Sequence, residues 1–166
     1  MDREMNIGKL QIRKADRDDV SLLRDLIKGL AAYEKRPQDV TGTEEQLAYW
    51  LFERNIAAAL IAEYEGEAIG YALYYPVFGS FSAAGGVHLE DLFIREEFRG
   101  CGLGRYFLAG VAEAVLAEGY TEMEWSCLDW NEAAVGFYKK LGAKQDKGRV
   151  YLGFHKSELE MIAALC

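Results

Sequence analysis

The residues that most clearly suggest chemistry lie where an apolar run meets a cluster of glycines. The run over 87–94 is a strong strand candidate, and Arg99–Arg105 follows it with glycines at positions 100, 102 and 104. Glycine lets backbone N–H groups approach a phosphate without an obstructing Cβ, and the N-terminus of a following helix adds partial positive charge. Arginines at 95, 99 and 105 concentrate positive charge in a chain of formal net charge −8. We therefore predict a polyanion site here.

Two common phosphate-binding motifs do not match this stretch. A Rossmann turn, G-x-G-x-x-G, would need glycine at 100, 102 and 105, and position 105 is arginine. The G-K-[ST] that opens a helix in a Walker motif is absent. The alternative to a binding role is that the glycines only shape a turn.

Two carboxylates, Glu90 and Asp91, interrupt the same predicted strand. Acidic residues are uncommon in the middle of an apolar strand, because an unpaired buried carboxylate is costly. Strict alternation puts Glu90 on one face with Leu92. It puts Asp91 on the opposite face with Leu89 and Phe93. A structural carboxylate pair is the alternative to a functional one.

The elements that position these residues follow from apolar periodicity and capping signals. Helix starts are marked by Asp16, by Thr43 with Gln46, and by Asn131, and Glu65-Gly66-Glu67 marks a hairpin. The order predicts a mixed α/β (α+β) fold with a single, twisted, mostly antiparallel sheet and helices on both faces. Strands are expected over 9–15, 57–64, 68–75, 87–94, 122–130 and 150–154, and helices over 16–34, 43–52, 103–116, 131–141 and 157–164.

Composition limits the class of protein. The 166 residues are 51% apolar and 28% charged, which is typical of one globular domain covering 1–166. The acidic balance argues against a nucleic-acid binder. Three widely spaced cysteines and two histidines match neither a disulfide framework nor a metal site. No apolar run is long enough to span a membrane, and the polar start lacks a signal-peptide core, so we expect a reduced, cytoplasmic protein.

Three stretches together resemble one family. Arg99-x-x-Gly102-x-Gly104 is similar to the acetyl-CoA pyrophosphate motif of the GCN5-related N-acetyltransferases (GNAT). Tyr33-Glu34 and the run from Leu128 through Asn131 to Ala143, together with Leu89–Phe93, resemble the diamine acetyltransferases, which include the spermidine/spermine and thialysine N-acetyltransferases. The resemblance extends from Ile12 to about Leu159, and it implies the GNAT fold.

The resemblance implies acetyl transfer from acetyl-CoA to a primary amine of a small molecule, a diamine, polyamine or thialysine-like amino acid, by direct attack in a ternary complex without a metal. Backbone N–H groups of the glycine turn would hold the pyrophosphate, and strand residues 92–94 would pair with the pantetheine amides. Asn131 would hold the pantetheine arm, and Tyr138 would protonate the departing thiolate. We expect the cofactor where strands 89–94 and 122–130 splay apart. The implied cofactor-binding residues are Leu92, Phe93, Ile94, Arg99, Gly100, Cys101, Gly102, Leu103, Gly104, Arg105, Asn131 and Tyr138.

The chemistry of amines agrees with these roles. A lysine-like amine has a pKa near 10.4, so about one molecule in 2,500 is neutral at pH 7. A carboxylate in the cleft, acting directly or through water, would bind the cation and then accept its proton. Glu90 is the candidate base and Tyr138 the candidate acid, since a phenol with a pKa near 10 can protonate a thiolate. Tyr33, Glu34, Glu90 and Asp91 are the predicted substrate-binding residues.

Some features distinguish among acceptors. Lys35-Arg36-Pro37 follows Tyr33-Glu34 where polyamine acetyltransferases are typically acidic, which disfavours a long polycation. The stretch 79–86 is small and uncharged, and Leu128–Asn131 is closer to thialysine-type members. A short amine with its own carboxylate, such as a thialysine-like amino acid, therefore competes with a small diamine.

Several alternatives stay open at this stage. One alternative is an acetyl-CoA sensor or interaction module that keeps the fold without turnover, and another is a protein N-acetyltransferase. A covalent acetyl-cysteine route through Cys101 or Cys127 lacks a visible base. The resemblance implies a homodimer, with the aromatic strand surface or the C-terminal segment as the interface. The aromatic side chains from Tyr71 to Phe81 are interpreted as core or interface, and His88 is interpreted as structural.

Overall fold

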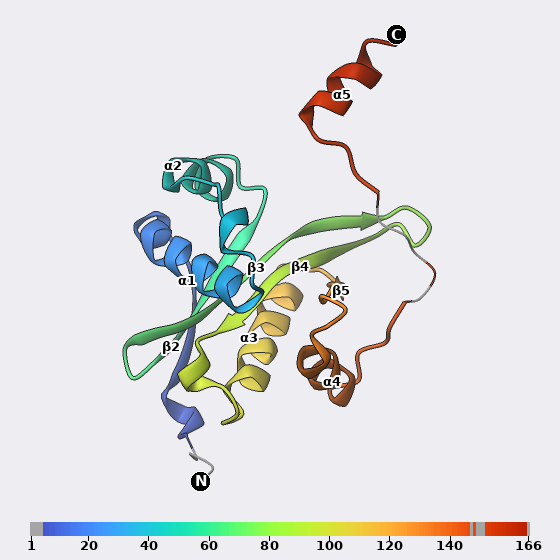
Figure 1. Ribbon diagram of the computed structural model, residues 1–166. Coiled ribbons are helices and arrows are strands. Elements are labelled where there is room, and N and C mark those ends of the chain that lie inside the picture. The colour runs from blue at the N-terminus through green and yellow to red at the C-terminus, as the bar shows by residue number, and fades with distance from the viewer. Residues whose placement is uncertain (1–4, 147, 149–151, 166) are drawn as a thin grey trace. The chain divides into compact units, whose positions relative to one another are not determined.

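The computed structural model describes residues 5–146, 148 and 152–165. Its contacts form two compact units, Met1–Ser126 and Cys127–Cys166. The larger unit holds all the strands of the described residues (Figure 1). These strands are β1 (Leu10–Lys14), β2 (Ala58–Tyr64), β3 (Glu67–Gly79), β4 (Ala84–Ile94) and β5 (Glu122–Glu124). Its α-helices are α1 (Val20–Tyr33), α2 (Glu44–Ala48) and α3 (Leu103–Ala117).

The five strands form one sheet in the order β1-β2-β3-β4-β5. The first four pair antiparallel, and β5 pairs parallel to β4. The β2–β3 hairpin turns at Glu65 and Gly66, whose φ angles of 51° and 83° are those of the primed turn that fits strand twist. The predicted mixed, mostly antiparallel sheet is confirmed.

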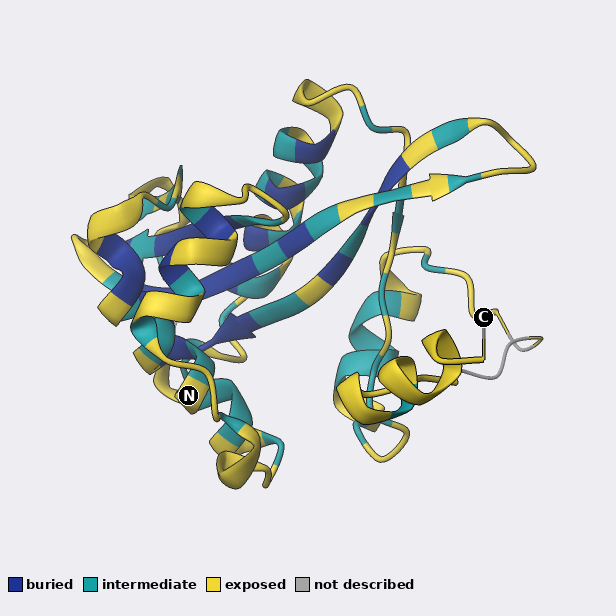
Figure 2. Cartoon of the chain, turned by 90° about the horizontal axis from the view of Figure 1, so that it is seen from above, coloured by how far each residue is buried: buried dark blue, intermediate teal, exposed yellow. Residues whose placement is uncertain are grey.

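A separate core covers each face of the sheet (Figure 2). On one face α3 packs Leu103, Phe107 and Val111 against the strands. On the other face Leu23 and Leu26 of α1 pack with sheet residues. The apolar stripes on these helices explain their placement, because each helix must bury its apolar side against the sheet. Helices therefore lie on both faces, as predicted.

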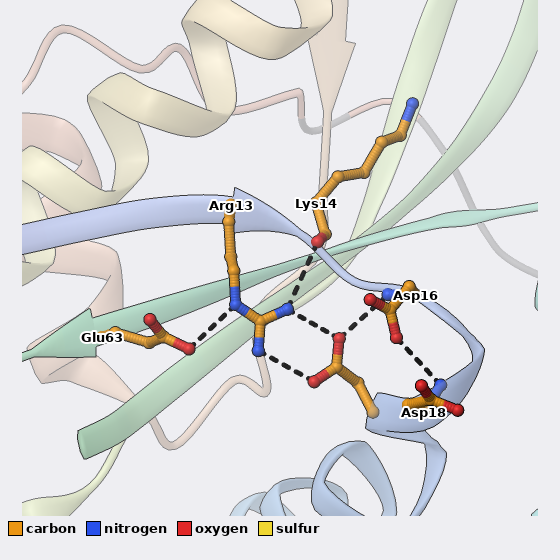
Figure 3. A network of polar contacts seen from close by, with 6 residues as sticks. Arg13, Lys14, Asp16, Asp18 and Glu63 are labelled. Carbon is orange, nitrogen blue, oxygen red and sulfur yellow. Dashed lines mark hydrogen bonds and ion pairs between the residues drawn. The ribbon is translucent and has the colours of Figure 1, made fainter. Parts of the chain in front are cut away.

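A network of ion pairs and hydrogen bonds links the start of α1 to the edge of the sheet (Figure 3). The Arg13 guanidinium on β1 donates to both carboxylate oxygens of Asp19, at 2.6 and 2.8 Å, and its Nε donates to Glu63 on β2 at 2.8 Å. Asp19 also accepts from the backbone N–H of Asp16. The Arg13 hydrogen bonds hold the pKa of the buried Asp19 carboxyl below its usual value.

Several boundaries differ from the sequence prediction. Asp16 caps a short 3-10 helix, η2 (Arg17–Asp19), and α1 begins only after it. The capping box of Thr43 and Gln46 is confirmed, but α2 ends at Ala48 and continues as a π-helical turn, η4 (Tyr49–Glu53). The strand expected over 122–130 is wrong in length, since β5 ends at Glu124.

The smaller unit contains α4 (Glu132–Lys140) and α5 (Lys156–Ala163). As predicted, the Asn131 side chain caps α4 by accepting from the Ala134 N–H at 3.2 Å, and Gly142 follows the helix with φ of 96°. Of the strand expected over 150–154, positions 150 and 151 lie outside the described residues. Leu152–Phe154 has no regular structure, so that part of the prediction is wrong. The single-domain interpretation stays a prediction.

Candidate active site

A bulge in β4 brings its two carboxylates to one side of the sheet. Leu89 pairs with Tyr74 and Asp91 with Leu73, so Glu90 is an extra residue without a partner in β3. An extra residue shifts the pleat that follows it. Strict alternation was therefore the wrong assumption for this strand.

The effect of the bulge is visible in the two cores. Leu89 packs in the core beneath α3, whereas Phe93 packs in the core beneath α1, although alternation would put them on one face. Glu90 and Asp91, which alternation would separate, line the same cavity. The cavity has a volume of about 730 Å³ and lies among α1, α2, β3, β4 and the segment that joins α1 to α2.

Glu34, at the C-terminal end of α1, joins the two carboxylates in this cavity. Three of the four predicted substrate-binding residues are thus brought together. The fourth, Tyr33, does not line it. Its ring lies in a second hollow, beneath the Arg99 guanidinium at 4.3 Å from the ring centroid. Tyr33 and Glu34 thus line different hollows, because successive helix residues point in different directions, and the substrate-binding role of Tyr33 stays a prediction.

Asp91 is bound by a tyrosine from the neighbouring strand. The buried Tyr71 hydroxyl donates to Asp91 Oδ2 at 2.8 Å. Burial raises the pKa of Asp91 to about 6, and the nearby Glu90 and Glu34 charges raise it too, while the Tyr71 hydrogen bond lowers it. Burial, with the Asp91 charge second, raises the pKa of Tyr71, so its phenol stays protonated and remains a donor.

Glu90 is held more loosely and is accessible. Its carboxylate accepts from the Tyr75 hydroxyl at 3.3 Å and lies 3.8 Å from His88 Nε2. The Glu90 side chain is 53% exposed. His88 stacks on the Tyr75 ring and lies 3.5 Å from Glu124 on β5 through its other nitrogen. An exposed carboxylate with adjustable partners is suited to exchanging protons with a ligand.

The glycine turn, residues 99–105, has a backbone geometry that leaves open space next to its main-chain N–H groups; we call it the cradle. Gly100 and Gly102 have φ of 76° and 87°, and a Cβ at either position would meet no atom within 4 Å. Gly102 is the N-cap of α3, and the Arg105 N–H donates to its carbonyl at 3.1 Å, so the N–H groups of Leu103 and Gly104 are the ones that no earlier turn of the helix can accept from. Both features fit a bound pyrophosphate. Arg99, next to this turn, donates from Nε to the Ile94 carbonyl at 2.7 Å.

The remaining members of the turn have different surroundings. Leu103 is buried in the core beneath α3, so only its backbone N–H can serve a ligand. Arg105 is exposed. The Cys101 thiol donates to the Phe98 carbonyl at 3.0 Å and lies 3.3 Å from the sulfur of Met5, which gives it no base. Gly104 falls in the first turn of α3.

The edge of β4 beyond His88 has no partner among the described strands. β5 pairs only with Gly86, Val87 and His88. The Arg95 N–H bonds to Ile69 of β3, so by alternation the main-chain groups of Phe93 face β3, and those of Leu92 and Ile94 face the open edge. Leu92 can thus pair with an extended ligand through both main-chain groups. Ile94 can do so through its N–H, since its carbonyl accepts from Arg99 Nε, whereas Phe93 cannot pair there.

Tyr138 and Asn131 belong to the smaller unit. Tyr138 is half-buried on α4, and its ring meets that of Phe137 edge to face. Burial, followed by the effect of Cys127, raises the pKa of Tyr138 above that of a free phenol. Asn131 is engaged through its side chain as the cap of α4.

The sequence alone did not identify several cavity residues. Tyr71 and Tyr75 were interpreted as core or interface, yet they bond the two carboxylates; their positions on β3 give a signal only once the register with the bulged β4 is known. Arg24 and Trp50 also line the cavity, from α1 and from η4.

Among the residues with described positions, no three histidine, cysteine or acidic side chains are placed to hold a metal ion. No helix within the described ranges is long and apolar enough to cross a membrane.

Comparison with known proteins places the chain in a family. The acetyltransferase (GNAT) family model matches residues 24–143. The thialysine N-epsilon-acetyltransferase of Sus scrofa is 34% identical over 147 residues, covering 83% of this chain and 86% of that protein. The L-ornithine N5-acetyltransferase of Arabidopsis thaliana is 39% identical over 75 residues, covering 45% of this chain and 33% of that protein.

The fold comparison agrees. A solved aminoglycoside acetyltransferase from an uncultured soil metagenomic sample, in complex with sisomicin, superimposes with a TM-score of 0.76 at 16% identity. The match covers 89% of this chain and 97% of that one. With the family model spanning most of the sequence, the chain belongs to the GNAT acetyltransferase family and is an N-acetyltransferase.

Proposed function

We propose that this enzyme transfers the acetyl group of acetyl-CoA to a primary amine on a small molecule, a diamine or a thialysine-like amino acid. One observation carries the proposal: Glu34, Glu90 and Asp91 line a single cavity of about 730 Å³. Such a cavity attracts a cation and is large enough for a small acceptor. The thialysine N-epsilon-acetyltransferase relatives support the same class of acceptor.

The residues that would hold acetyl-CoA are those of the glycine turn and the open edge of β4. Gly100 and Gly102 leave space for the pyrophosphate, and the N-terminus of α3 offers N–H groups and partial positive charge. Leu92 and Ile94 offer main-chain groups to the pantetheine arm. When bound, acetyl-CoA supplies an activated acetyl thioester.

Glu90 is the proposed base. Removing the proton from a lysine-like ammonium at pH 7 costs about 4.6 kcal/mol. Asp91 holds the ammonium as an ion pair, and Glu90, being more accessible, accepts the proton directly or through water. Tyr75 and His88 position the Glu90 carboxylate.

Tyr138 is the proposed acid. Its raised pKa keeps the phenol protonated at neutral pH, so that it can deliver a proton to the leaving sulfur. Asn131 caps the helix that carries Tyr138 and is the proposed contact for the pantetheine arm. Because the family resemblance implies a homodimer, the proposal also includes that the enzyme acts as a homodimer in the cytoplasm.

The test is release of CoA from acetyl-CoA with a panel of amines: putrescine, spermidine, ornithine, lysine, thialysine, an aminoglycoside and a peptide. Turnover confined to diamines or diamino acids would support the proposal. Turnover of the peptide alone would point to a protein acetyltransferase. Tight acetyl-CoA binding without turnover of any amine would point to a sensor.

A variant pair checks the assigned base. Glu90→Gln should lower kcat/KM for the best amine by about a hundredfold or more, because general base catalysis typically contributes that much. Glu113→Gln, an exposed glutamate on α3 outside the cavity, is the matched control. Equal rates in the two variants would remove Glu90 from the mechanism.

A further inference from the structure

We infer that Arg24 recognises an anionic group on the acceptor, which makes the preferred substrate a diamino acid rather than a diamine. This inference rests on the proposed function and concerns the same cavity. Arg24 lies on α1 and lines the cavity that holds Glu34, Glu90 and Asp91. One cavity therefore offers both carboxylates for an amine and a guanidinium for an anion.

The Arg24 side chain is anchored but not neutralised. It is half-buried, and its Nε donates to the Gly42 carbonyl at 3.2 Å, which ties α1 to the segment before α2. It forms no ion pair with any residue whose position the structure describes. The pKa of Glu45 is lowered, and the charge of Arg24 is the smallest of several causes of this shift. Arg24 and Glu45 form no ion pair. The terminal nitrogens of Arg24 keep donors suited to a carboxylate.

The other arginine of the cavity, Arg36, differs in this respect. Its Nε donates to Asp39 Oδ2 at 2.6 Å within the same short turn, so its charge is balanced. A balanced arginine offers little attraction to a second carboxylate, because the pair is already neutral. Arg24 is therefore the stronger candidate for recognising an anion.

The spacing along α1 suits a two-ended molecule. Arg24 and Glu34 are ten residues apart, about 15 Å along the helix axis, and Ile27 and Ala31 lie between them on the same cavity wall. The Arg24 side chain can cover part of this distance, and an extended acceptor lying along the cavity wall can cover the rest. Ile27 and Ala31, in the middle of this wall, suit the methylene groups of the acceptor, and the end of the wall at Glu34 suits its amine. A diamino acid has this order of groups.

The experiment compares acceptors that differ only by a carboxylate: ornithine with putrescine, and lysine with cadaverine. We expect the wild type to favour the amino acid of each pair. In Arg24→Gln the ratio of kcat/KM for amino acid over diamine should fall by about ten- to a hundredfold, the usual value of a charged hydrogen bond. The matched control is Lys28→Gln, an exposed cation of the same helix that does not line the cavity.

A second variant separates charge from loop anchoring. Arg24→Lys keeps the positive charge but loses the Nε–H that bonds Gly42. Retention of much of the amino-acid preference in Arg24→Lys supports recognition by charge. A ratio in Arg24→Gln equal to the wild type, or an equal loss in both variants, overturns the inference and leaves the proposed function intact. Absence of turnover with all four amines, and also with thialysine and spermidine, in the wild type overturns both.

Discussion

The phenol oxygen of Tyr71 lies 2.8 Å from the carboxylate of Asp91, and the two residues come from adjacent antiparallel strands. The register would pair Asp91 with Leu73 rather than with Tyr71, so this contact is diagonal across the sheet. It fixes the Asp91 carboxylate, whereas the neighbouring Glu90 carboxylate is held by a longer hydrogen bond from Tyr75, at 3.3 Å.

The raised pKa of Asp91 predicts how activity depends on pH. Below a pH of about 6 the carboxyl is protonated and no longer holds an ammonium, so KM for the amine should rise as the pH falls through that value. Tyr71→Phe removes the hydrogen bond that lowers this pKa and should move the acid limb of the kcat/KM profile upward. A kcat/KM profile whose acid limb is unchanged in Tyr71→Phe would show that Asp91 does not take part in acceptor binding.

The same pKa has a consequence for stability. Since the folded-state pKa of Asp91 lies above the usual carboxyl value of 3.8, the ionised carboxylate destabilises the fold above pH 6, and this loss of stability shrinks as the pH falls from 6 towards 3.8. Asp91→Asn should therefore raise the free energy of unfolding at pH 8 and leave it nearly unchanged at pH 4. Urea denaturation at the two pH values measures the difference.

Tyr138 should affect the rate and not donor binding. Tyr138→Phe removes the proton donor and keeps the ring that meets Phe137, so kcat should fall by about a hundredfold or more. The dissociation constant for acetyl-CoA, measured by calorimetry, should stay within about twofold of the wild type. An unchanged kcat would rule out the assignment of Tyr138 as the acid.

Two glycines at opposite ends of α3 provide a matched test of the cradle. Gly102 and Gly119 both have φ of 87°, and a Cβ at either would meet no atom within 4 Å. Alanine at each position should cost a similar amount of stability, about 1 kcal/mol. Only Gly102→Ala should also weaken acetyl-CoA binding, by about tenfold or more, since its methyl group enters the space assigned to the pyrophosphate. Equal affinities for acetyl-CoA in the two variants would show that the pyrophosphate does not bind at Gly102.

The charge network at the sheet edge should matter for stability alone. Asp19→Asn removes the carboxylate that binds Arg13 twice and should lower the free energy of unfolding by about 1–3 kcal/mol at pH 7. Because the folded-state pKa of Asp19 is lowered, its contribution is present above the unfolded pKa and is lost as the pH falls through the folded value. The variant's deficit should accordingly vanish in strong acid, while kcat at neutral pH is preserved.

The sequence predicted elements well wherever a local signal specifies them. The Glu65-Gly66 turn, the Thr43 capping box and the glycine turn before α3 each depend on a few neighbouring residues. The bulge at Glu90 depends instead on the pairing of β4 with β3, which periodicity within one strand cannot reveal. For this reason Glu90 and Asp91 were assigned to opposite faces, and Tyr71 and Tyr75 were not connected with them.

Longer-range geometry also limited the prediction of the site. The sequence grouped Tyr33 and Glu34 with Glu90 and Asp91. Glu34 lines the cavity with the two carboxylates, whereas Tyr33 lies in a different hollow, because successive residues at the end of α1 point in different directions. Arg24 lies ten residues before Glu34, and only the folded helix shows that both border one cavity.

The early end of the β4–β5 ladder also bears on how the protein behaves in storage. The Leu92 N–H and carbonyl and the Ile94 N–H, which pair with no described strand, form a short edge to which a strand of another molecule can add, while the Ile94 carbonyl is bonded to Arg99. A pantetheine arm paired with those groups would block such addition. Turbidity of concentrated protein should therefore develop more slowly with CoA present than without it, and CoA should act as a formulation additive as well as a product.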